Sequence, residues 1–432
     1  MIGILMFASA LLLLLLGFPV AFTFGGAAVF FGLFAEGTKI FSLMPHRIYA
    51  VMNNTILMAI PLFIFMGIIL QKSKLAERLL ESMGSLFGEI RGGIAISTVL
   101  VGALLAASTG VVGASVVAMG VISLPVMLKY NYDKRLATGT ICASGTLGQI
   151  IPPSIILIIL GDVFQQPVGD LFKAAFWPGL SLVLVYIAYI VIITIINPKL
   201  APPIRLGVEH GNKGKQIITA LKAIVPPLVL IVLVLGSILF GVATPTESAA
   251  VGGVGAVLLA AIYRQLSKRM IWDAASETVK ISAMVFAILI GATAFSMVFT
   301  YTGGDYLVED FMMALPGGKW GFLIFSMGAI MTLGFFIDFV EIAYIIVPIL
   351  APIADKLGID PLWYAILVAM NLQTSFLTPP FGFSLFYLKG VAPPEVRTMD
   401  IYRGVAPFIA LQVMVLIILV LFPGFFGFDA FN

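Results

Sequence analysis

Two interrupted apolar segments constrain the fold of this chain more than any other feature of its sequence. The segment "DKRLATGTICASGTLGQIIPPS" begins at Asp133, and "DPLWYAILVAMNLQTSFLTPPF" begins at Asp360. The aspartates are 227 residues apart (360 − 133), and the same spacing separates Pro152–Pro153 from Pro379–Pro380. Proline cannot donate a backbone hydrogen bond, and it moves the preceding residue out of the helical region. Each apolar helix must therefore stop at its proline pair.

The remainder of the chain has the composition of a membrane protein. Of its 432 residues 61% are hydrophobic and 10% are charged, whereas soluble domains carry about 25% charged residues. Apolar runs of membrane-spanning length recur from residue 2 to residue 422. These runs predict an all-α polytopic membrane protein surrounded by a lipid bilayer.

Several functional classes are disfavoured by what the sequence contains. The single cysteine, Cys142, excludes a disulfide framework, and the two histidines lie far apart. The stretch "GNKGKQ" from Gly211 lacks the final Ser or Thr of a P-loop, so the chain does not hydrolyse ATP through that motif. Serines are plentiful, but no histidine is placed to activate one. We therefore expect neither an enzyme nor a nucleic-acid-binding protein.

The near-constant spacing of similar segments predicts a duplicated chain. The first repeat is placed at 1–197, a cytoplasmic linker at 198–222 and the second repeat at 223–432. Two further apolar stretches, about 93–128 and about 320–350, carry small or polar residues midway and are predicted to form re-entrant hairpins. The broken helices are placed at about 136–165 and about 361–388.

The distribution of basic residues predicts the orientation of the halves. With ten spanning segments, 19 of the 24 lysines and arginines fall in loops on one side, which is then the cytoplasmic side. Both termini are expected outside. Five crossings in each half is an odd number, so the two repeats are predicted to be inverted relative to each other. Inverted repeats with broken helices are typical of secondary transporters.

The breaks themselves predict a binding site. Unsatisfied backbone groups cost several kcal/mol in hydrocarbon, so a break must be buried in protein or line an aqueous cavity. Free carbonyls and hydroxyls suit a small hard cation, while the amides of a new helix N-terminus favour a carboxylate. We predict that the substrate is bound by polar residues at the breaks and at the first hairpin: Ser108, Thr109, Gln149, Ser154, Gln373, Thr374, Ser375 and Thr378.

The turns of the two hairpins differ in chemistry. The first, "AASTGVVGAS" from Ala106, suits either a tight turn that exposes carbonyls or close packing of helices. The second, "LGFFIDFVE" from Leu333, contains Asp338 and Glu341, and ionisable residues within apolar segments are usually functional. Because the two acids are three positions apart, both would lie on one helix face. We expect Asp338 to face the site and Glu341 to turn toward solvent or the hairpin edge.

The motifs together resemble those of a known transporter family. "GVATPTESAA", "IPPS", "GIDPLWYAILVAMNLQTSFLTPPFG" and "YLKGVAP" are similar to segments of the large membrane subunit of tripartite ATP-independent periplasmic (TRAP) transporters. The resemblance covers essentially the whole chain. It implies an elevator-type fold in the bacterial inner membrane and sodium coupling. It also implies two partners, a small four-helix membrane subunit and a periplasmic protein that delivers a small organic acid.

The resemblance also implies two sodium sites. One falls at Ser108, Thr109 and Gly110, next to the break at Gly145 and Gly148. The other falls at Gly334 and Asp338, next to the break at Thr374 and Thr378. Many family members have Asp-Pro-Thr or Asp-x-Thr in the second hairpin, whereas Asp338 is followed by "FVE" here. That departure leaves the ligands of the second hairpin open.

Two questions about transport stay open from the sequence. A one-component organic anion symporter, coupled to sodium or protons and working without a binding protein, is the alternative to a tripartite system. The version "NLQTSFLTPPFGFSLFYLKGVAP" resembles family members linked to 2-oxo acids and lactate. No Lys, Arg or His lies in the segments assigned to the site, so a substrate carboxylate would be met by amides, hydroxyls and bound cations.

Overall fold

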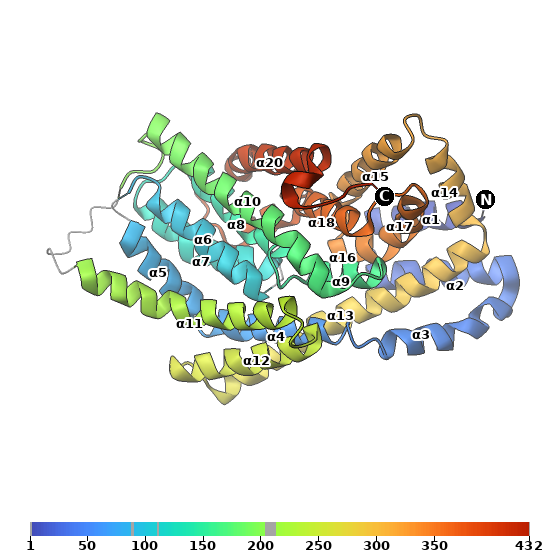
Figure 1. The fold of residues 1–432 in the computed structure, drawn as a ribbon, viewed down its shortest axis with the longest axis horizontal. Coiled ribbons are helices and arrows are strands. Elements are labelled where there is room, and N and C mark those ends of the chain that lie inside the picture. Colours follow the sequence, from blue (N-terminus) through green and yellow to red (C-terminus); the bar gives the residue numbers. More distant parts are fainter. Residues whose placement is uncertain (1, 88–89, 110–111, 204–212, 432) are drawn as a thin grey trace.

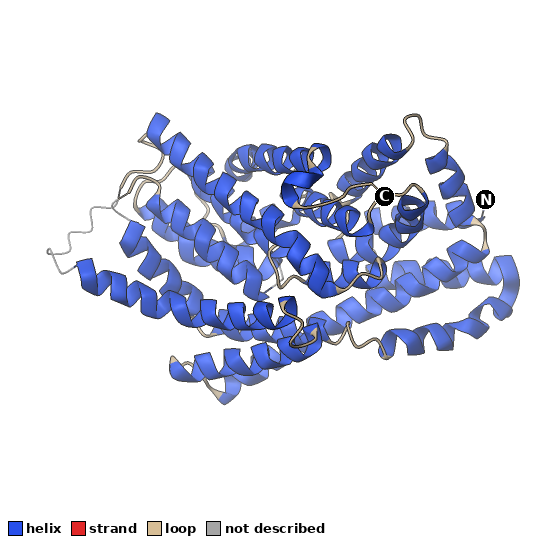
Figure 2. Cartoon of the chain, in the orientation of Figure 1, coloured by secondary structure: helices blue, strands red, loops and turns tan. Residues whose placement is uncertain are grey.

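Helices make up almost all of the regular structure. The computed structural model describes residues 2–87, 90–109, 112–203 and 213–431, which form helices joined by loops, with one isolated antiparallel bridge between Ile359 and Phe431 (Figure 2). The prediction of an all-α polytopic membrane protein is confirmed. By length and composition, seven helical segments of the described chain are apolar enough to cross a membrane: Val20–Met52, α7 (Val112–Lys129), α10 (Val168–Ile196), Ala220–Leu239, α12 (Pro245–Ile262), α13 (Lys268–Tyr301) and α20 (Thr398–Leu421).

Several other apolar helices are too short to span a bilayer alone. A spanning helix needs about 20 residues. The shorter ones are α1 (Ile2–Leu15), α4 (Ala59–Lys72), α6 (Gly93–Thr109) and α15 (Lys319–Leu333). The two proline pairs divide two further runs into α8 (Lys134–Thr146) with α9 (Ile155–Val163), and α18 (Pro361–Leu377) with α19 (Phe383–Val391).

The helices pack as two groups that lie side by side in Figure 1. We call residues 2–87 with 213–313 the frame group, in which α4 packs on α12 and α13, and α13 also packs on α2 (Val20–Glu36). Residues 93–196 with 319–421 are the break group. In it α6 and α7 pack on α8, α15 packs on α18, and α8 packs on α20. Both interrupted helices therefore belong to the same group.

Polar contacts join the two groups at their boundary. Asn54, just before α4, donates from Nδ2 to Oδ1 of Asp162 in α9 at 2.6 Å. Lys356 of α17 (Val347–Lys356) pairs with Glu309 of α14 (Gly304–Met313) at 2.5 Å. Each contact connects one element of the frame group with one element of the break group.

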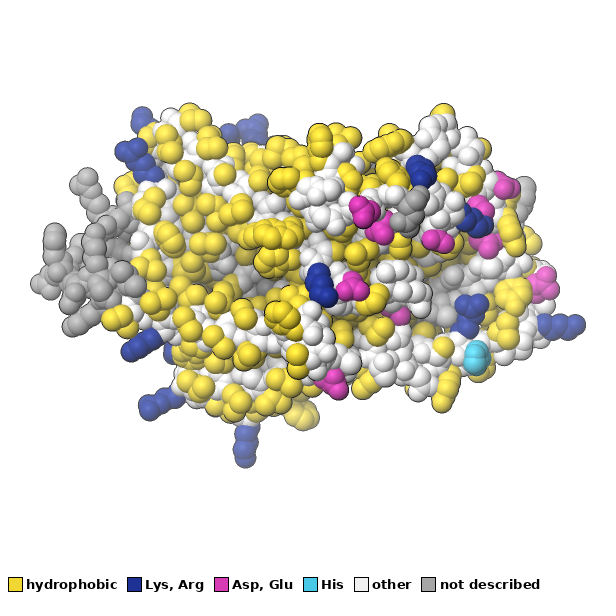
Figure 3. Space-filling view, viewed as in Figure 1, with side chains coloured by type: hydrophobic (Ala, Val, Ile, Leu, Met, Phe, Trp, Pro, Cys, Tyr) yellow, Lys and Arg dark blue, Asp and Glu magenta, His cyan; other side chains and the backbone are white. Residues whose placement is uncertain are grey.

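The two ends of the molecule differ in charge. Figure 1 places the N- and C-terminal ends at the right, whereas the C-terminal end of α10 and the N-terminal end of α11 (Lys213–Leu239) lie at the left. Figure 3 shows Lys and Arg side chains at both ends and the visible Asp and Glu side chains in the right half, so that only the left end shows basic side chains alone. The predicted outside position of both termini and the cytoplasmic position of the linker stay predictions.

Short amphipathic helices connect several of the longer apolar helices, in regions expected to be loops. The described chain includes α3 (Met44–Met52), α5 (Leu75–Phe87) and α14. In α5, Leu75, Leu79 and Leu80 are buried while Glu77 is exposed. A single apolar stripe of this kind supports a helix once it packs against a neighbour, and α5 packs against α6 and α11.

Candidate functional site

The first break begins with a capped helix. The carboxylate of Asp133 accepts hydrogen bonds from the backbone N–H groups of Arg135 and Leu136, at 2.9 and 3.1 Å, and so caps α8. The chain continues through a short 3₁₀ turn, Leu147–Gln149, and leaves the helical conformation before α9 begins at Ile155. The half-helix and the turn are buried among neighbouring helices over nearly their whole length.

The second break repeats this construction. Asp360 caps α18 by accepting from the backbone N–H of Trp363 at 2.6 Å. The helix ends at Leu377, Thr378 has extended backbone angles, and α19 begins at Phe383. The bond within each proline pair is cis. α18 packs against both α9 and the Leu147–Gln149 turn, so the two interrupted helices meet in one region.

A buried glutamine precedes each break. Gln149 is 1% exposed and Gln373 is 0% exposed. Within the described residues neither the Nε2 nor the Oε1 atom of either side chain has a hydrogen-bond partner. A buried amide without partners is costly unless a ligand or water satisfies it, which is the state expected of a binding residue.

The hydroxyls at the breaks are held by their own backbone. Thr374, Ser375 and Thr378 donate to the carbonyls of Met370, Leu372 and Thr374 at 2.7–2.8 Å. In the first half, Ser154 donates to the carbonyl of Gln149 at 2.5 Å. Since each hydroxyl hydrogen is engaged, the oxygen presents its lone pairs, which suit a cation better than a carboxylate. Their predicted contacts with substrate or sodium remain predictions.

The first hairpin packs closely on the first broken helix. A Cβ at Gly102 of α6 would lie 2.6 Å from Cβ of Ser144, and a Cβ at Gly145 of α8 would lie 3.1 Å from Cα of Val116. Gly145 therefore has a packing role, independent of its predicted place beside a sodium ion, and Gly148 is buried in the adjoining turn. The side chains of Ser108 and Thr109, and all of Gly110, lie outside the described residues.

The second hairpin packs on the second broken helix at its turn. Gly334 caps the C-terminus of α15, and a Cβ there would overlap the side chain of Ser375. Asp338 follows in an extended conformation (φ −72°, ψ 162°), and its Oδ1 accepts from the N–H of Phe339 at 2.8 Å. The structure thus brings Gly334 beside the second break, as the predicted sodium site requires, and leaves Asp338 half-buried.

The expectation that Glu341 turns toward solvent is wrong, while its alternative, a position at the hairpin edge, stays a prediction. Its side chain is 4% exposed, and within the described chain Oε2 has no hydrogen-bond partner. The short helix Phe339–Glu341 and the following Ile342–Ile346 turn pack against α9 and α13 rather than facing solvent. Asp338 caps this helix, and the Glu341 carboxylate, three positions further on, stays close enough to interact electrostatically with Asp338.

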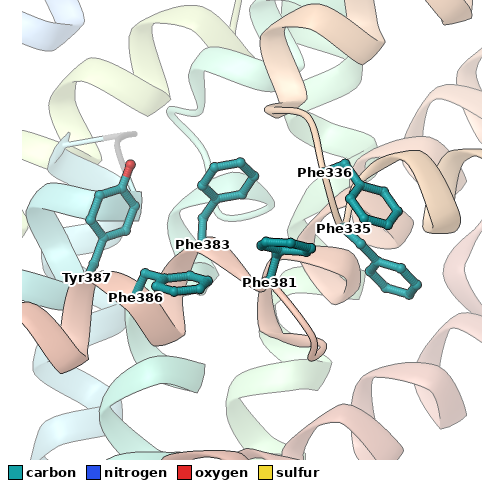
Figure 4. Close-up of a pocket in the computed structure, with 6 residues that line it drawn as sticks. All are labelled: Phe335, Phe336, Phe381, Phe383, Phe386 and Tyr387. Atoms are coloured by element: carbon teal, nitrogen blue, oxygen red, sulfur yellow. The ribbon is translucent and has the colours of Figure 1, made fainter. Parts of the chain in front are cut away.

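A cavity of about 310 Å³ opens beside the second hairpin and the second break. Figure 4 shows its lining, in which two aromatic side chains come from the hairpin turn and four from the chain after the proline pair: Phe335, Phe336, Phe381, Phe383, Phe386 and Tyr387. None of these residues was predicted from the sequence. In the sequence, these aromatic residues cannot be distinguished from aromatic residues that face lipid. Only the structure shows that residues as far apart as Phe335 and Phe381, 46 positions, line one cavity.

Tyr387 connects this cavity to both hairpins. A Cβ at Gly113, near the start of α7, would lie 2.9 Å from Cζ of the Tyr387 ring, so the ring rests on the backbone of the first hairpin. The carboxylates of Asp338 and Glu341 are close enough to act electrostatically on the Tyr387 hydroxyl. The aromatic cavity therefore lies where the two hairpins and the second break approach one another.

Comparison with known proteins identifies membrane permeases that are similar to this chain. The sequence is 30% identical over 422 residues to the ectoine TRAP transporter large permease protein TeaC of Halomonas elongata, covering 97% of this chain and 96% of TeaC. It is 30% identical to the isethionate TRAP transporter permease protein DctMQ of Oleidesulfovibrio alaskensis, covering 97% of this chain and 65% of DctMQ.

The fold also has a solved counterpart. The crystal structure of the Alcanivorax borkumensis YdaH transporter, described as having an unusual topology, aligns with a TM-score of 0.64 over 90% of each chain, at 14% identity. The family described as "Tripartite ATP-independent periplasmic transporter, DctM component" matches residues 7–425. The chain is thus a membrane transport protein and not an enzyme, and it belongs to the DctM family of TRAP transporter large permeases of the inner membrane.

Proposed function

We propose that this chain takes up a small organic acid across the inner membrane together with sodium ions, receiving the acid from a periplasmic binding protein. The observation that carries the proposal is the pair of buried glutamines at the breaks. Gln149 and Gln373 each present an unpartnered amide where a helix is interrupted inside an apolar group of helices. Such groups are retained in a membrane protein where they serve a ligand.

Sodium coupling is supported by the kind of oxygen found at the breaks. Thr374 and Ser375 turn their hydrogens to the backbone and leave lone pairs free for a cation, and Ser375 lies against Gly334 at the second hairpin turn. Asp338 supplies one carboxylate beside that turn. Hydroxyl, carbonyl and carboxylate oxygens are ligands for hard cations.

An elevator mechanism is supported by the division into two groups of helices. Both interrupted helices and both hairpins lie in the break group, so a rigid movement of that group would carry the whole site. Its contacts with the frame group include the Asn54–Asp162 hydrogen bond and the exposed Lys356–Glu309 ion pair. The ion pair is exposed and contributes little to holding the groups together. Since α6 also packs against α4 and α5, the movement requires these helices to slide past one another.

The partners follow from the family and from one relative. A DctM component works in a tripartite system, and the chain covers only 65% of the relative named DctMQ, which leaves room there for a second permease component. We infer that the small four-helix membrane subunit covers exposed apolar faces of the frame group. Phe22 and Phe34 on α2 are 80% and 76% exposed.

Uptake by proteoliposomes tests the proposal. The complex with its small subunit is reconstituted, an inward sodium gradient is imposed, and radiolabelled acids are offered with and without binding protein. We expect accumulation that requires both sodium and the binding protein. Unchanged uptake when choline replaces sodium at fixed pH would refute coupling, and full uptake without the binding protein would indicate a one-component symporter.

Variants of the two glutamines test the site. Replacing Gln149 or Gln373 with Leu should lower uptake at least about tenfold because the ligand loses a hydrogen-bonding partner. Gln412→Leu is the matched control, since Gln412 is equally buried and its amide likewise has no hydrogen-bond partner among the described residues, but it lies on α20, outside both interrupted helices. If all three variants behave alike, the effect reflects general packing and the proposed site is wrong.

A further inference from the structure

The aromatic cavity contains rings that are large, close together and incompletely covered. The rings of Phe336 and Phe381 lie 5.3 Å apart between centroids, and those of Phe381 and Phe386 lie 6.3 Å apart with planes inclined by 28°. The side chains of Phe381 and Phe386 are 47% and 54% exposed. Aromatic rings prefer tilted or offset neighbours at about 4.5–7 Å between centroids, so this lining offers surfaces on which another ring could pack.

The lining also selects against certain substrates. Among the six described residues that line it, the Tyr387 hydroxyl is the only polar side-chain atom, and none of the six carries a charge. A second carboxylate of a dicarboxylic acid would have to lie against phenyl rings without a donor, which is unfavourable. A volume of about 310 Å³ is at the small end for ligand cavities and suits one ring with a short acid chain.

The position of the cavity favours a transported substrate over a lipid chain. The cavity reaches from the second hairpin turn to the second break, and Tyr387 rests on Gly113 of the first hairpin. Asp338, a proposed sodium ligand, acts electrostatically on the same hydroxyl. A bound sodium ion there would offset the charge of a single carboxylate placed at the Tyr387 end.

We propose that this cavity binds the apolar part of the transported acid, and that the substrate is a monocarboxylate that carries an aromatic ring. The proposal rests on the function proposed above and narrows its substrate class. The carboxylate lies toward Tyr387 and the sodium site. The ring packs among Phe336, Phe381 and Phe386.

Equilibrium binding measurements test whether the ligand needs an aromatic ring and a single carboxylate. The complex with its small subunit is placed in lipid nanodiscs, and ¹⁴C-phenylacetate is bound in sodium buffer and displaced with acetate, cyclohexylacetate or succinate. We expect phenylacetate to bind at least about tenfold more tightly than acetate and succinate, with cyclohexylacetate in between. Displacement by succinate as effective as displacement by phenylacetate would overturn the proposal.

Substitutions of residues that line the cavity test whether phenylacetate binds there. Phe381→Ala and Phe336→Ala should weaken phenylacetate binding about tenfold, while Phe381→Leu should weaken it less. Phe425→Ala, at a phenylalanine near the C-terminal end that is 79% exposed, is the control and should leave phenylacetate affinity unchanged. Phenylacetate affinity unchanged by both cavity variants would overturn the assignment and would fit a cavity filled by lipid.

The failure of this inference is separable from failure of the proposed function. Sodium-dependent uptake of succinate in proteoliposomes, with no binding of phenylacetate, would refute the aromatic substrate and leave organic acid transport intact. No sodium-dependent uptake or binding of any of the four acids would refute both.

Discussion

The two halves of the permease share a backbone plan but differ in what they present to a ligand. Asp133 and Asp360 cap the two interrupted helices, and Gln149 and Gln373 are buried just before the two breaks. The first hairpin meets its broken helix through small residues, as at Gly102 against Ser144. The second hairpin adds two acids and two exposed or half-exposed phenylalanines.

This difference shows which parts of a duplicated transporter are constrained by folding. A half-helix buried in an apolar group needs a capped start and a proline-defined end, and both halves retain them. The hairpins differ in their side chains, since only the second contains Asp or Glu and phenylalanine. We therefore expect cation binding and substrate selection to depend more on the second half than on the first.

The largest effect should come from separating the second hairpin from its broken helix. Gly334→Val places side-chain atoms where Ser375 lies, and overpacking of this kind costs about 1–3 kcal/mol. We expect proteoliposome uptake to fall to background. Gly328→Val on the same helix is the control, because a Cβ at Gly328 meets nothing within 4 Å. Equal loss in both variants would mean that α15 tolerates no valine, rather than that the hairpin contact matters.

A smaller effect is expected when corresponding residues of the two halves are substituted and the sodium dependence of uptake is compared. Asp338→Asn should raise the sodium concentration for half-maximal uptake about fivefold to tenfold, because an amide oxygen replaces a charged ligand. Ser115 occupies the corresponding place in the first half and is buried. Ser115→Ala should change the same constant less than about twofold. A larger effect of Ser115→Ala than of Asp338→Asn would reverse the assignment.

The smallest effect should be the same in both halves. Asp133→Ala and Asp360→Ala each remove one N-cap and should lower the stability of the purified complex by about 1 kcal/mol. Thermal unfolding of the two variants measures it, and Ser at either position should restore most of the loss. A loss at only one position would show that the caps are not equivalent and would weaken the case for a shared plan.

The sequence predicted the fold well because the breaks and apolar runs are local signals. The proline pairs ended α18 and the turn after α8 where expected. Amphipathic α5 was missed since its apolar stripe is short and interrupted by charges. Glu341 was expected toward solvent, but its helix packs against α9 and α13, and such contacts between distant segments leave no local signal in the sequence. The aromatic cavity depends on Phe336 meeting Phe381 across the hairpin, which no local pattern encodes.

The central claim is that both breaks travel together as one group against the frame group. Asn54 and Asp162 lie on opposite sides of the boundary, with Nδ2 and Oδ1 2.6 Å apart. The native Cys142 is buried and so should not interfere with thiol chemistry at the surface. A double variant, Asn54→Cys with Asp162→Cys, therefore permits a specific cross-link between the groups.

Uptake by proteoliposomes is measured before cross-linking, after cross-linking with a short bis-methanethiosulfonate that joins the two thiols through disulfides, and after reduction of those disulfides, with each single variant as control. We predict that cross-linking abolishes uptake, that reduction restores it, and that the single variants transport throughout. Normal sodium-driven uptake by fully cross-linked protein would show that the two groups need not move apart, and would contradict the account.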